Sequence, residues 1–285
     1  MAPSLMQRVV IVVLRLQGRK RRWSHGAQLV ETAREHNARG PVALPAWLAK
    51  RVRVATSAET GFAVHTLSPL VESPGAPTIL YLHGGGFIHD FAHQHFTYLT
   101  SIVEGSGATV IAPQYPLAPQ HTWRDSFEQV VELARGVDVV MGDSAGGGYA
   151  LAVSQALAAE GTARDTVLVA PIIDLTLSSG KTAEYDAVDP WLASDGIRHA
   201  AAAWAGEDDP ARPELSPMFG SFEGLGRVLV FTGTRDLLHP QARQLLRRLP
   251  SAQLVSEPGC VHNYPILPTP EAARALQSLE AFLHR

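Results

Sequence analysis

Short runs of apolar residues recur between residues 78 and 255, and longer segments with helical periodicity separate them. Apolar runs without alternation are typical of strands that are buried on both faces of a parallel sheet. We therefore predict strands at 78–82, 108–113, 137–141, 166–170, 227–233 and 252–255. Helices are expected at 90–105, 123–134, 144–160 and 270–283. This alternation predicts an α/β fold with a mostly parallel central sheet flanked by helices.

A different pattern precedes this region. Val52 and Val54, and later Phe62, Val64 and Thr66, alternate with polar or small residues. A period of two predicts half-buried strands, and the segment 59–61 between them ends in a glycine that suits a turn. We expect an antiparallel hairpin here.

The first 50 residues contain two expected helices, the second at 28–38. The apolar run at 9–14 is too short to span a bilayer, and no signal-peptide cleavage site follows it. The basic run at 19–22 could be a nuclear or membrane-surface signal, but we interpret it as a solvated helix end. The sequence thus predicts no integral membrane segment.

Composition narrows the class of protein. A chain of 285 residues with 46% hydrophobic residues can form one large α/β domain with insertions. Its net charge of −3 gives no general attraction to polyanions, so no nucleic-acid partner is expected. The single cysteine, Cys260, excludes an internal disulfide framework, which fits a reducing compartment and leads us to expect a cytoplasmic location.

The sequence Gly-Asp-Ser-Ala-Gly at residues 142–146 joins a predicted strand to a predicted helix. A serine with glycines two residues away on each side has the form of a nucleophile elbow, a tight and strained turn. Side chains at 142 or 146 would collide with the neighbouring strand or helix, so glycine is required there. We expect Ser144 to be exposed above the sheet edge, with the N–H of Ala145 directed at an oxyanion.

A second glycine cluster, His-Gly-Gly-Gly-Phe at residues 83–87, directly follows the strand at 78–82. Three successive glycines cost conformational entropy and pack poorly, so they suit a place where the backbone must approach a ligand closely. We predict that the N–H groups of Gly85 and Gly86 join that of Ala145 in an oxyanion hole.

Three histidines near this loop, His89, His93 and His95, raise the alternative of a metal site together with Asp90. If 90–105 is a helix, His89 and His93 share a face while His95 points elsewhere, and no cysteine or glutamate completes the set. We interpret these histidines as solvent-facing or pocket-wall residues and predict no metal.

The segments 83–87, 115–119 (Tyr-Pro-Leu-Ala-Pro) and 142–147 resemble, in order and spacing, three signatures of the hormone-sensitive-lipase-like family of α/β-hydrolases. The similarity extends over roughly residues 50–285. It departs from the family at Gln114 and Pro116, because the family usually has Asp and Arg at these two positions. The resemblance implies the α/β-hydrolase fold with a helical cap.

The resemblance also implies a catalytic triad with Ser144, because a serine hydroxyl needs a histidine base and an orienting carboxylate. Asp236 follows the strand at 227–233 and matches the family's acid loop, and His262 matches the catalytic histidine. Three competitors also follow strands or lie near the acid, and we expect none of them in the triad: Asp174, Glu257 and His239.

We expect two regions, 1–50 with N-terminal helices that join the cap and 51–285 as the catalytic domain, with a cap insertion at about 172–215. This insertion contains a predicted helix at 195–204. The candidates for an apolar substrate pocket are Phe87, Trp191, Leu192 and Trp204.

Together these features predict a serine carboxylesterase or lipase-like hydrolase that cleaves short- to medium-chain acyl esters, with acetyl esters among the candidates. The expected partner is a small-molecule ester; no cofactor is expected, and a homodimer is allowed. Two alternatives stay open: an amidase or deacetylase with the same triad, and a non-catalytic ligand-binding member of the fold.

Overall fold

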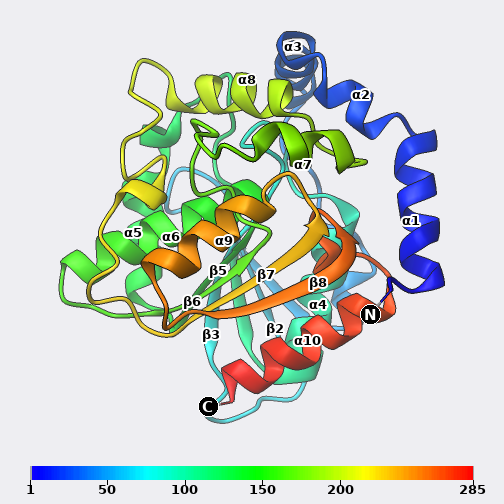
Figure 1. Cartoon of the computed structure of the whole chain (residues 1–285). Helices are drawn as coiled ribbons and strands as arrows, with labels where there is room; N and C mark the ends of the chain where they lie inside the picture. Colours follow the sequence, from blue (N-terminus) through cyan, green and yellow to red (C-terminus); the bar gives the residue numbers. More distant parts are fainter. Residues whose placement is uncertain (1, 285) are drawn as a thin grey trace.

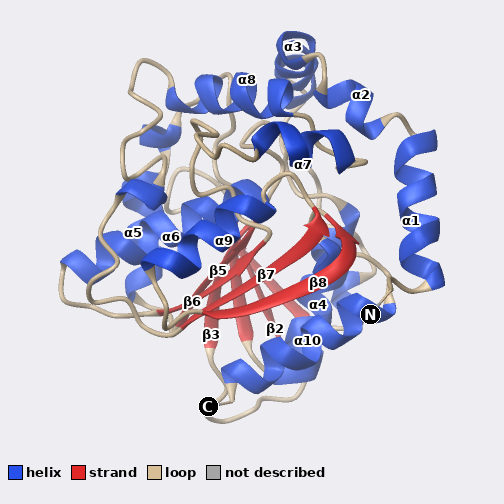
Figure 2. Ribbon diagram, in the orientation of Figure 1, coloured by secondary structure: helices blue, strands red, loops and turns tan. Residues whose placement is uncertain are grey.

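The computed structural model describes residues 2–284, and its centre is one eight-stranded sheet (Figures 1 and 2). The strand order is β1-β2-β4-β3-β5-β6-β7-β8. The hairpin β1–β2 and the pair β2–β4 are antiparallel, and the other neighbours are parallel. The bounds are β1 Arg53–Ser57, β2 Val64–Ser68, β3 Thr78–Leu82, β4 Thr109–Pro113, β5 Val139–Asp143, β6 Asp165–Val169, β7 Val228–Arg235 and β8 Gln253–Val261. The predicted α/β fold class is confirmed.

Helices cover both faces of the sheet, because successive residues of a strand point to opposite sides. Ile79 and Tyr81 of β3 pack in one core cluster with α4 and α10, whereas Leu80 and Leu82 pack in another with α5, α6 and α9. The bounds of these helices are α4 His93–Ser106, α5 Phe127–Arg135, α6 Ser144–Ala159, α9 His239–Arg248 and α10 Pro270–Leu283.

Two predicted helices begin later than expected, and local hydrogen bonds explain both shifts. Asp90 accepts hydrogen bonds from the backbone N–H of Val42 and of Phe91, so its side chain organises a turn and α4 starts only at His93. The helix predicted at 123–134 divides into a 3₁₀ turn, Trp123–Asp125, and α5. In that turn Asp125 accepts from the N–H of Thr122, which competes with a continuous helix.

The remaining helices form a layer beyond the carboxyl ends of the parallel strands and along one side of the sheet (Figure 1). They are α1 Leu5–Leu16, α2 Arg19–Trp23, α3 Gly26–Asn37, α7 Thr182–Val188 and α8 Ser194–Ala205. Helices α2 and α3 pack on α8, and the N–H of Gly26 donates to the Asp195 carboxylate at 2.6 Å. This layer therefore combines the first 40 residues with the segment between β6 and β7.

Helix α1 is attached near the C-terminal part of the chain. The N–H and hydroxyl of Ser4 donate to the Glu271 carboxylate of α10 at 2.6 and 2.8 Å. Ile11 and Leu14 pack against Val261 at the end of β8. Within residues 2–284, no helix combines the length and the apolar character that crossing a bilayer requires.

Candidate active site

Ser144 lies in the tight turn between β5 and α6. Its φ of 51° belongs to the left-handed region, which is rare for a residue with a side chain and stores strain. A Cβ on Gly142 would lie 2.2 Å from the carbonyl oxygen of Gly146, and one on Gly146 would lie 2.0 Å from that of Leu82. These contacts give the physical reason why both glycines are required around Ser144.

The structure brings Ser144 together with the two other residues predicted to act with it. The Nε2 atom of His262 lies 2.9 Å from Ser144 Oγ, and its Nδ1 lies 3.0 Å from Asp236 Oδ2. Asp236 follows β7 and His262 follows β8, so the ends of β5, β7 and β8 supply the three side chains, and β6 lies between β5 and β7. The Asp236 carboxylate accepts one further hydrogen bond, from the N–H of Leu238 at 2.8 Å. All three residues are buried, so the expectation that Ser144 is exposed above the sheet edge is wrong; Ser144 lines a cavity instead.

The environment of His262 favours its charged form. Burial alone would lower the pKa of the imidazole, but the nearby carboxylates of Asp236, Asp189 and Asp143 raise it above the usual value. An imidazolium that forms by taking a proton from Ser144 is therefore surrounded by negative charge. This arrangement suits a histidine that must hold a proton during a reaction.

Asp143, which sequence reasoning did not single out, joins the three loops around Ser144. Its carboxylate accepts hydrogen bonds from Gly84 N at 2.7 Å, Asn263 Nδ2 at 2.6 Å and Tyr81 Oη at 2.6 Å. The Nε2 of His95 lies 3.3 Å away. Burial would raise the pKa of Asp143, but His95 and these hydrogen bonds outweigh it and hold the pKa at about 2. Asp143 is therefore a buried anion that fixes the loops on either side of the serine.

Asp189 is a second buried carboxylate that the sequence did not reveal. It accepts from the N–H groups of Trp191 and Leu192 at 2.7 and 3.0 Å, and from that of Leu237 at 2.7 Å. Burial, and then the neighbouring charge of Asp236, raise the pKa of Asp189 to about 6. Asp189 therefore links the segment between β6 and β7 to the residue that follows Asp236.

The predicted oxyanion loop runs directly past Ser144. Gly85 and Gly86 have φ values of 117° and 66°, which a residue with a side chain adopts only with strain. Gly86 and Ser144 line the same cavity, and Ala145 lies in the first turn of α6, where backbone N–H groups lack helical acceptors. Gly85 and Ala145 adjoin these two cavity-lining residues in the chain, and the N-terminal end of α6 carries positive potential.

The loop at 115–119 packs against the glycine-rich loop at 83–87, which we call the oxyanion loop. The ring of Tyr115 stacks on His83 with centroids 4.3 Å apart, and its hydroxyl donates to the carbonyl oxygen of His83 at 2.6 Å. Gln114 stands where the family has Asp. Its side-chain Nε2 donates to Asp90 Oδ2 at 2.6 Å, and its side-chain Oε1 lies 3.2 Å from His65 Nε2. Hydrogen bonds of the Gln114 side-chain amide therefore occupy the position where the family pattern suggests an ion pair.

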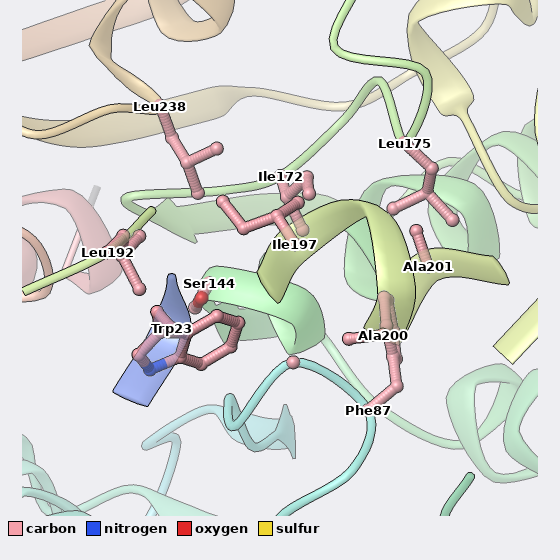
Figure 3. A pocket seen from close by; sticks show the side chains of 11 residues that line it. Trp23, Phe87, Ser144, Ile172, Leu175, Leu192, Ile197, Ala200, Ala201 and Leu238 are labelled. Carbon is pink, nitrogen blue, oxygen red and sulfur yellow. The ribbon is translucent and has the colours of Figure 1, made fainter. Parts of the chain in front are cut away.

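A narrow apolar cavity opens above Ser144 (Figure 3). Its empty space, including the mouth, is about 310 Å³. Two of the predicted pocket residues, Phe87 and Leu192, line it. The other lining residues are Trp23, Gly86, Ser144, Ile172, Leu175, Ile197, Ala200, Ala201 and Leu238.

The two tryptophans predicted for the pocket take other places. Trp204 packs behind Phe87, with parallel rings 4.8 Å apart, and Trp191 packs edge-on against the ring of His262 at 5.8 Å. The tryptophan in the cavity is Trp23 of α2, whose indole lies beside Ser144 in Figure 3. A Cβ on Gly86 would lie 2.7 Å from this indole. In the sequence Trp23 directly follows the basic run at 19–22, and nothing in that run indicates a place in the cavity.

The competing residues have structural contacts of their own. Asp174 accepts hydrogen bonds from Thr176 and Ser178 in its own loop. Glu257 pairs with Arg274, and His239 lies 3.2 Å from Thr232 Oγ1. Cys260 is buried in the core, where burial raises the pKa of its thiol well above the usual value.

The histidines considered for a metal site lie in different surroundings. His89 precedes α4 rather than sharing a helical face with His93, so that part of the sequence argument is wrong. His93 packs edge-on against Trp47, and His95 accepts from the N–H of Ala92 while it faces Asp143. Among residues 2–284, no group of three or more His, Cys, Asp or Glu side chains is arranged to hold a metal ion.

Comparison with known proteins agrees with this geometry. The sequence pattern of a family described as "alpha/beta hydrolase fold" matches residues 79–266. An acetyl-hydrolase of Streptomyces hygroscopicus is 29% identical over 225 residues, which cover 72% of this chain and 75% of the relative. An esterase of Acinetobacter venetianus is 25% identical over 222 residues, covering 72% and 73% of the two chains.

Solved structures give the same picture. The crystal structure of an esterase from the bacterial hormone-sensitive lipase family is 25% identical and superimposes with a TM-score of 0.80. The match covers 99% of this chain and 98% of that structure. The resemblance that the sequence motifs indicated is confirmed. The chain therefore belongs to the α/β-hydrolase family and is similar to its hormone-sensitive-lipase-like esterases.

Proposed function

We propose that this carboxylic ester hydrolase cleaves short-chain acyl esters through Ser144, His262 and Asp236. The observation that carries the proposal is the continuous chain of hydrogen-bond contacts from Ser144 Oγ through His262 to Asp236. The Ser144 end of this chain lies at an apolar cavity. The esterases and the acetyl-hydrolase among the relatives support ester hydrolysis as the class of reaction.

In the first step Ser144 Oγ attacks the ester carbonyl carbon while His262 Nε2 accepts the hydroxyl proton. Asp236 keeps Nδ1 of His262 protonated and Nε2 free to act as the base. The tetrahedral intermediate collapses when His262 returns the proton to the leaving alcohol. Water, activated by the same histidine, then hydrolyses the acyl-enzyme and regenerates Ser144.

The N–H groups of Gly85, Gly86 and Ala145 hold the oxyanion of the tetrahedral intermediates in this proposal. Backbone donors cost no reorganisation when charge develops, and each contributes about 3 kcal/mol in comparable sites. The rigid support of the loop by Tyr115 and Asp143 favours this role.

We further propose that α1–α3 and the segment between β6 and β7 form a cap that sets the substrate size. Trp23, Leu192 and Ile197 of this layer line the cavity above Ser144. Because the cavity is narrow and lined by aromatic and aliphatic side chains, short acyl groups fit it better than long ones. The cytoplasmic location, the homodimer and the absence of a nucleic-acid partner remain predictions from the sequence.

The test is hydrolysis of p-nitrophenyl esters from acetate to palmitate by the wild-type protein, Ser144→Ala and Ser154→Ala. Ser154 is a matched control, because it is a buried serine on the same helix whose Oγ accepts from Thr166 Oγ1. We expect turnover to peak at short chains, to fall at least about a thousandfold in Ser144→Ala, and to persist in Ser154→Ala.

Two outcomes would overturn the proposal. Folded wild-type protein that cleaves none of these esters would favour a binding role. Faster turnover of the matching p-nitroanilides than of the esters would favour an amidase with the same triad.

A further inference from the structure

Helix α1 has an apolar stripe that faces away from the protein. Leu5, Val9, Val12 and Leu16 follow each other at intervals of three or four residues, and Leu5 and Leu16 are 78% and 83% exposed. Met6 and Val13 widen this stripe. The opposite face of the same helix is already used, because Ile11 and Leu14 pack on Val261. We call the exposed set (Leu5, Met6, Val9, Val12, Val13 and Leu16) the outer stripe.

Positive charge accompanies the outer stripe. Arg8 and Arg15, seven residues apart, lie along one border of it and are exposed. Residues 1–30 contain six arginine and lysine residues and no aspartate or glutamate, although the chain as a whole has a net charge of −3. Over the part of the chain that the structure describes, no carboxylate lies within ion-pair distance of Arg8, Arg15, Arg21 or Arg22.

We propose that α1 docks the protein on an anionic lipid surface, with the outer stripe inserted at the level of the headgroups. A short helix with an apolar face bordered by arginines lies in the plane of a membrane interface, where it gains both apolar burial and attraction to anionic lipid. With 12 residues, α1 lies on the surface and does not span it.

Charge favours lipid over a second copy of the chain as the occupant. In an antiparallel twofold contact between two outer stripes, the arginines at the border of each copy would lie on the same side, and like charges repel. An anionic membrane instead supplies the complementary charge along the full length of α1 and α2.

Helix α1 is linked by packing to the residues around Ser144, so docking of α1 on a membrane would also position the cavity. Val10, a half-buried residue of α1, packs in the same cluster as Trp191, whose ring contacts His262. Helix α2, which follows α1, carries Trp23 into the cavity above Ser144. A membrane-bound α1 would therefore hold the cavity close to the lipid surface.

The experiment is co-sedimentation of the full chain with vesicles of phosphatidylcholine mixed with phosphatidylglycerol, and with vesicles of phosphatidylcholine alone. The variants are Val12→Glu/Leu16→Glu in the outer stripe and Arg8→Gln/Arg15→Gln at its border. Leu70→Glu/Val71→Glu is the matched control, because these two residues are also exposed and apolar but lie outside α1. Light scattering without lipid reports the oligomeric state.

We expect binding to the anionic vesicles that weakens with added salt. The arginine variant should bind about 25-fold more weakly, at about fivefold for each of the two charges. The outer-stripe variant should lose binding, and the control should keep it. Equal binding by the outer-stripe variant and the wild-type protein, or no vesicle binding at all, would overturn the proposal. A dimer that only the outer-stripe variant disperses would assign the stripe to a second copy. All these readouts are independent of ester hydrolysis.

Discussion

Asp143 shows how one buried carboxylate can control three loops. In Asp143→Asn, the amide oxygen can still accept from Tyr81 and Gly84, but the amide nitrogen then faces Asn263 Nδ2, which is also a donor. We expect a loss of about 2 kcal/mol in the free energy of unfolding and a fall in kcat of about tenfold to a hundredfold, because Asn263 adjoins His262. Urea unfolding and esterase kinetics measure the two effects.

The control is Asp174→Asn, since Asp174 is equally buried but its carboxylate accepts hydrogen bonds only from its own loop. It should lower stability with a smaller effect on kcat. Wild-type kcat and stability in Asp143→Asn would contradict the role assigned to this carboxylate.

Asp189, which lies far from His262 in the sequence, helps to raise the pKa of His262. Its negative charge is one of those that raise the pKa of His262, so Asp189→Asn should lower that pKa. A base acts only when it is neutral, and activity therefore rises as pH passes through its pKa. We expect the acidic limb of the kcat/KM profile for p-nitrophenyl acetate to move to lower pH in the variant. Asp186→Asn, a change in the same segment, should leave the limb in place, and an upward shift in Asp189→Asn would contradict the argument.

Helix α6 has three successive glycines directly after Ser144 and Ala145, although glycine weakens helices. The structure gives the reason, because a Cβ on Gly148 would lie 1.8 Å from the carbonyl oxygen of Ile172, a residue that lines the cavity. In Gly148→Ala the gain in helix propensity, about 1 kcal/mol, is smaller than the cost of this overlap with backbone. We expect a net loss of about 1–3 kcal/mol in stability together with lower esterase activity.

Gly180→Ala is the matched variant, because no heavy atom lies within 4 Å of its added Cβ and the position lies outside the regular helices. Thermal unfolding should place it close to the wild-type protein. A Gly148→Ala protein that is more stable than the wild type would show that the Ile172 segment moves away at little cost.

The cavity brings together segments that are far apart along the chain. Trp23 of α2 lies between Gly86 of the oxyanion loop and Gly196 of α8, and a Cβ on either glycine would lie 2.6–2.7 Å from the indole. Trp23→Ala should therefore open the space above Ser144. We expect KM to fall for p-nitrophenyl octanoate relative to acetate, since a longer acyl chain can then enter. An unchanged ratio of the two KM values would show that other residues limit the length.

The nucleophile elbow, the glycine-rich loop and the core strands could be predicted from the sequence, because each depends on residues that are adjacent along the chain. The elbow around Ser144 and the glycines at 85 and 86 have requirements that are local to the backbone, and the apolar runs specify strands buried on both faces. The family resemblance then supplied Asp236 and His262, and the fold brings these residues to Ser144. The start of α4 was missed, because a side-chain hydrogen bond of Asp90 decides it.

Residues that act across the fold could be identified only in three dimensions. Asp189 is 47 positions before Asp236 and Trp23 is 63 positions before Gly86, so no spacing in the chain relates them. Burial decides the pKa of Asp189, and the packing of α2 and α8 over the strand ends decides which tryptophan lines the cavity. The local sequence therefore determines the backbone requirements of the site, whereas desolvation and cavity shape arise only when distant segments pack together.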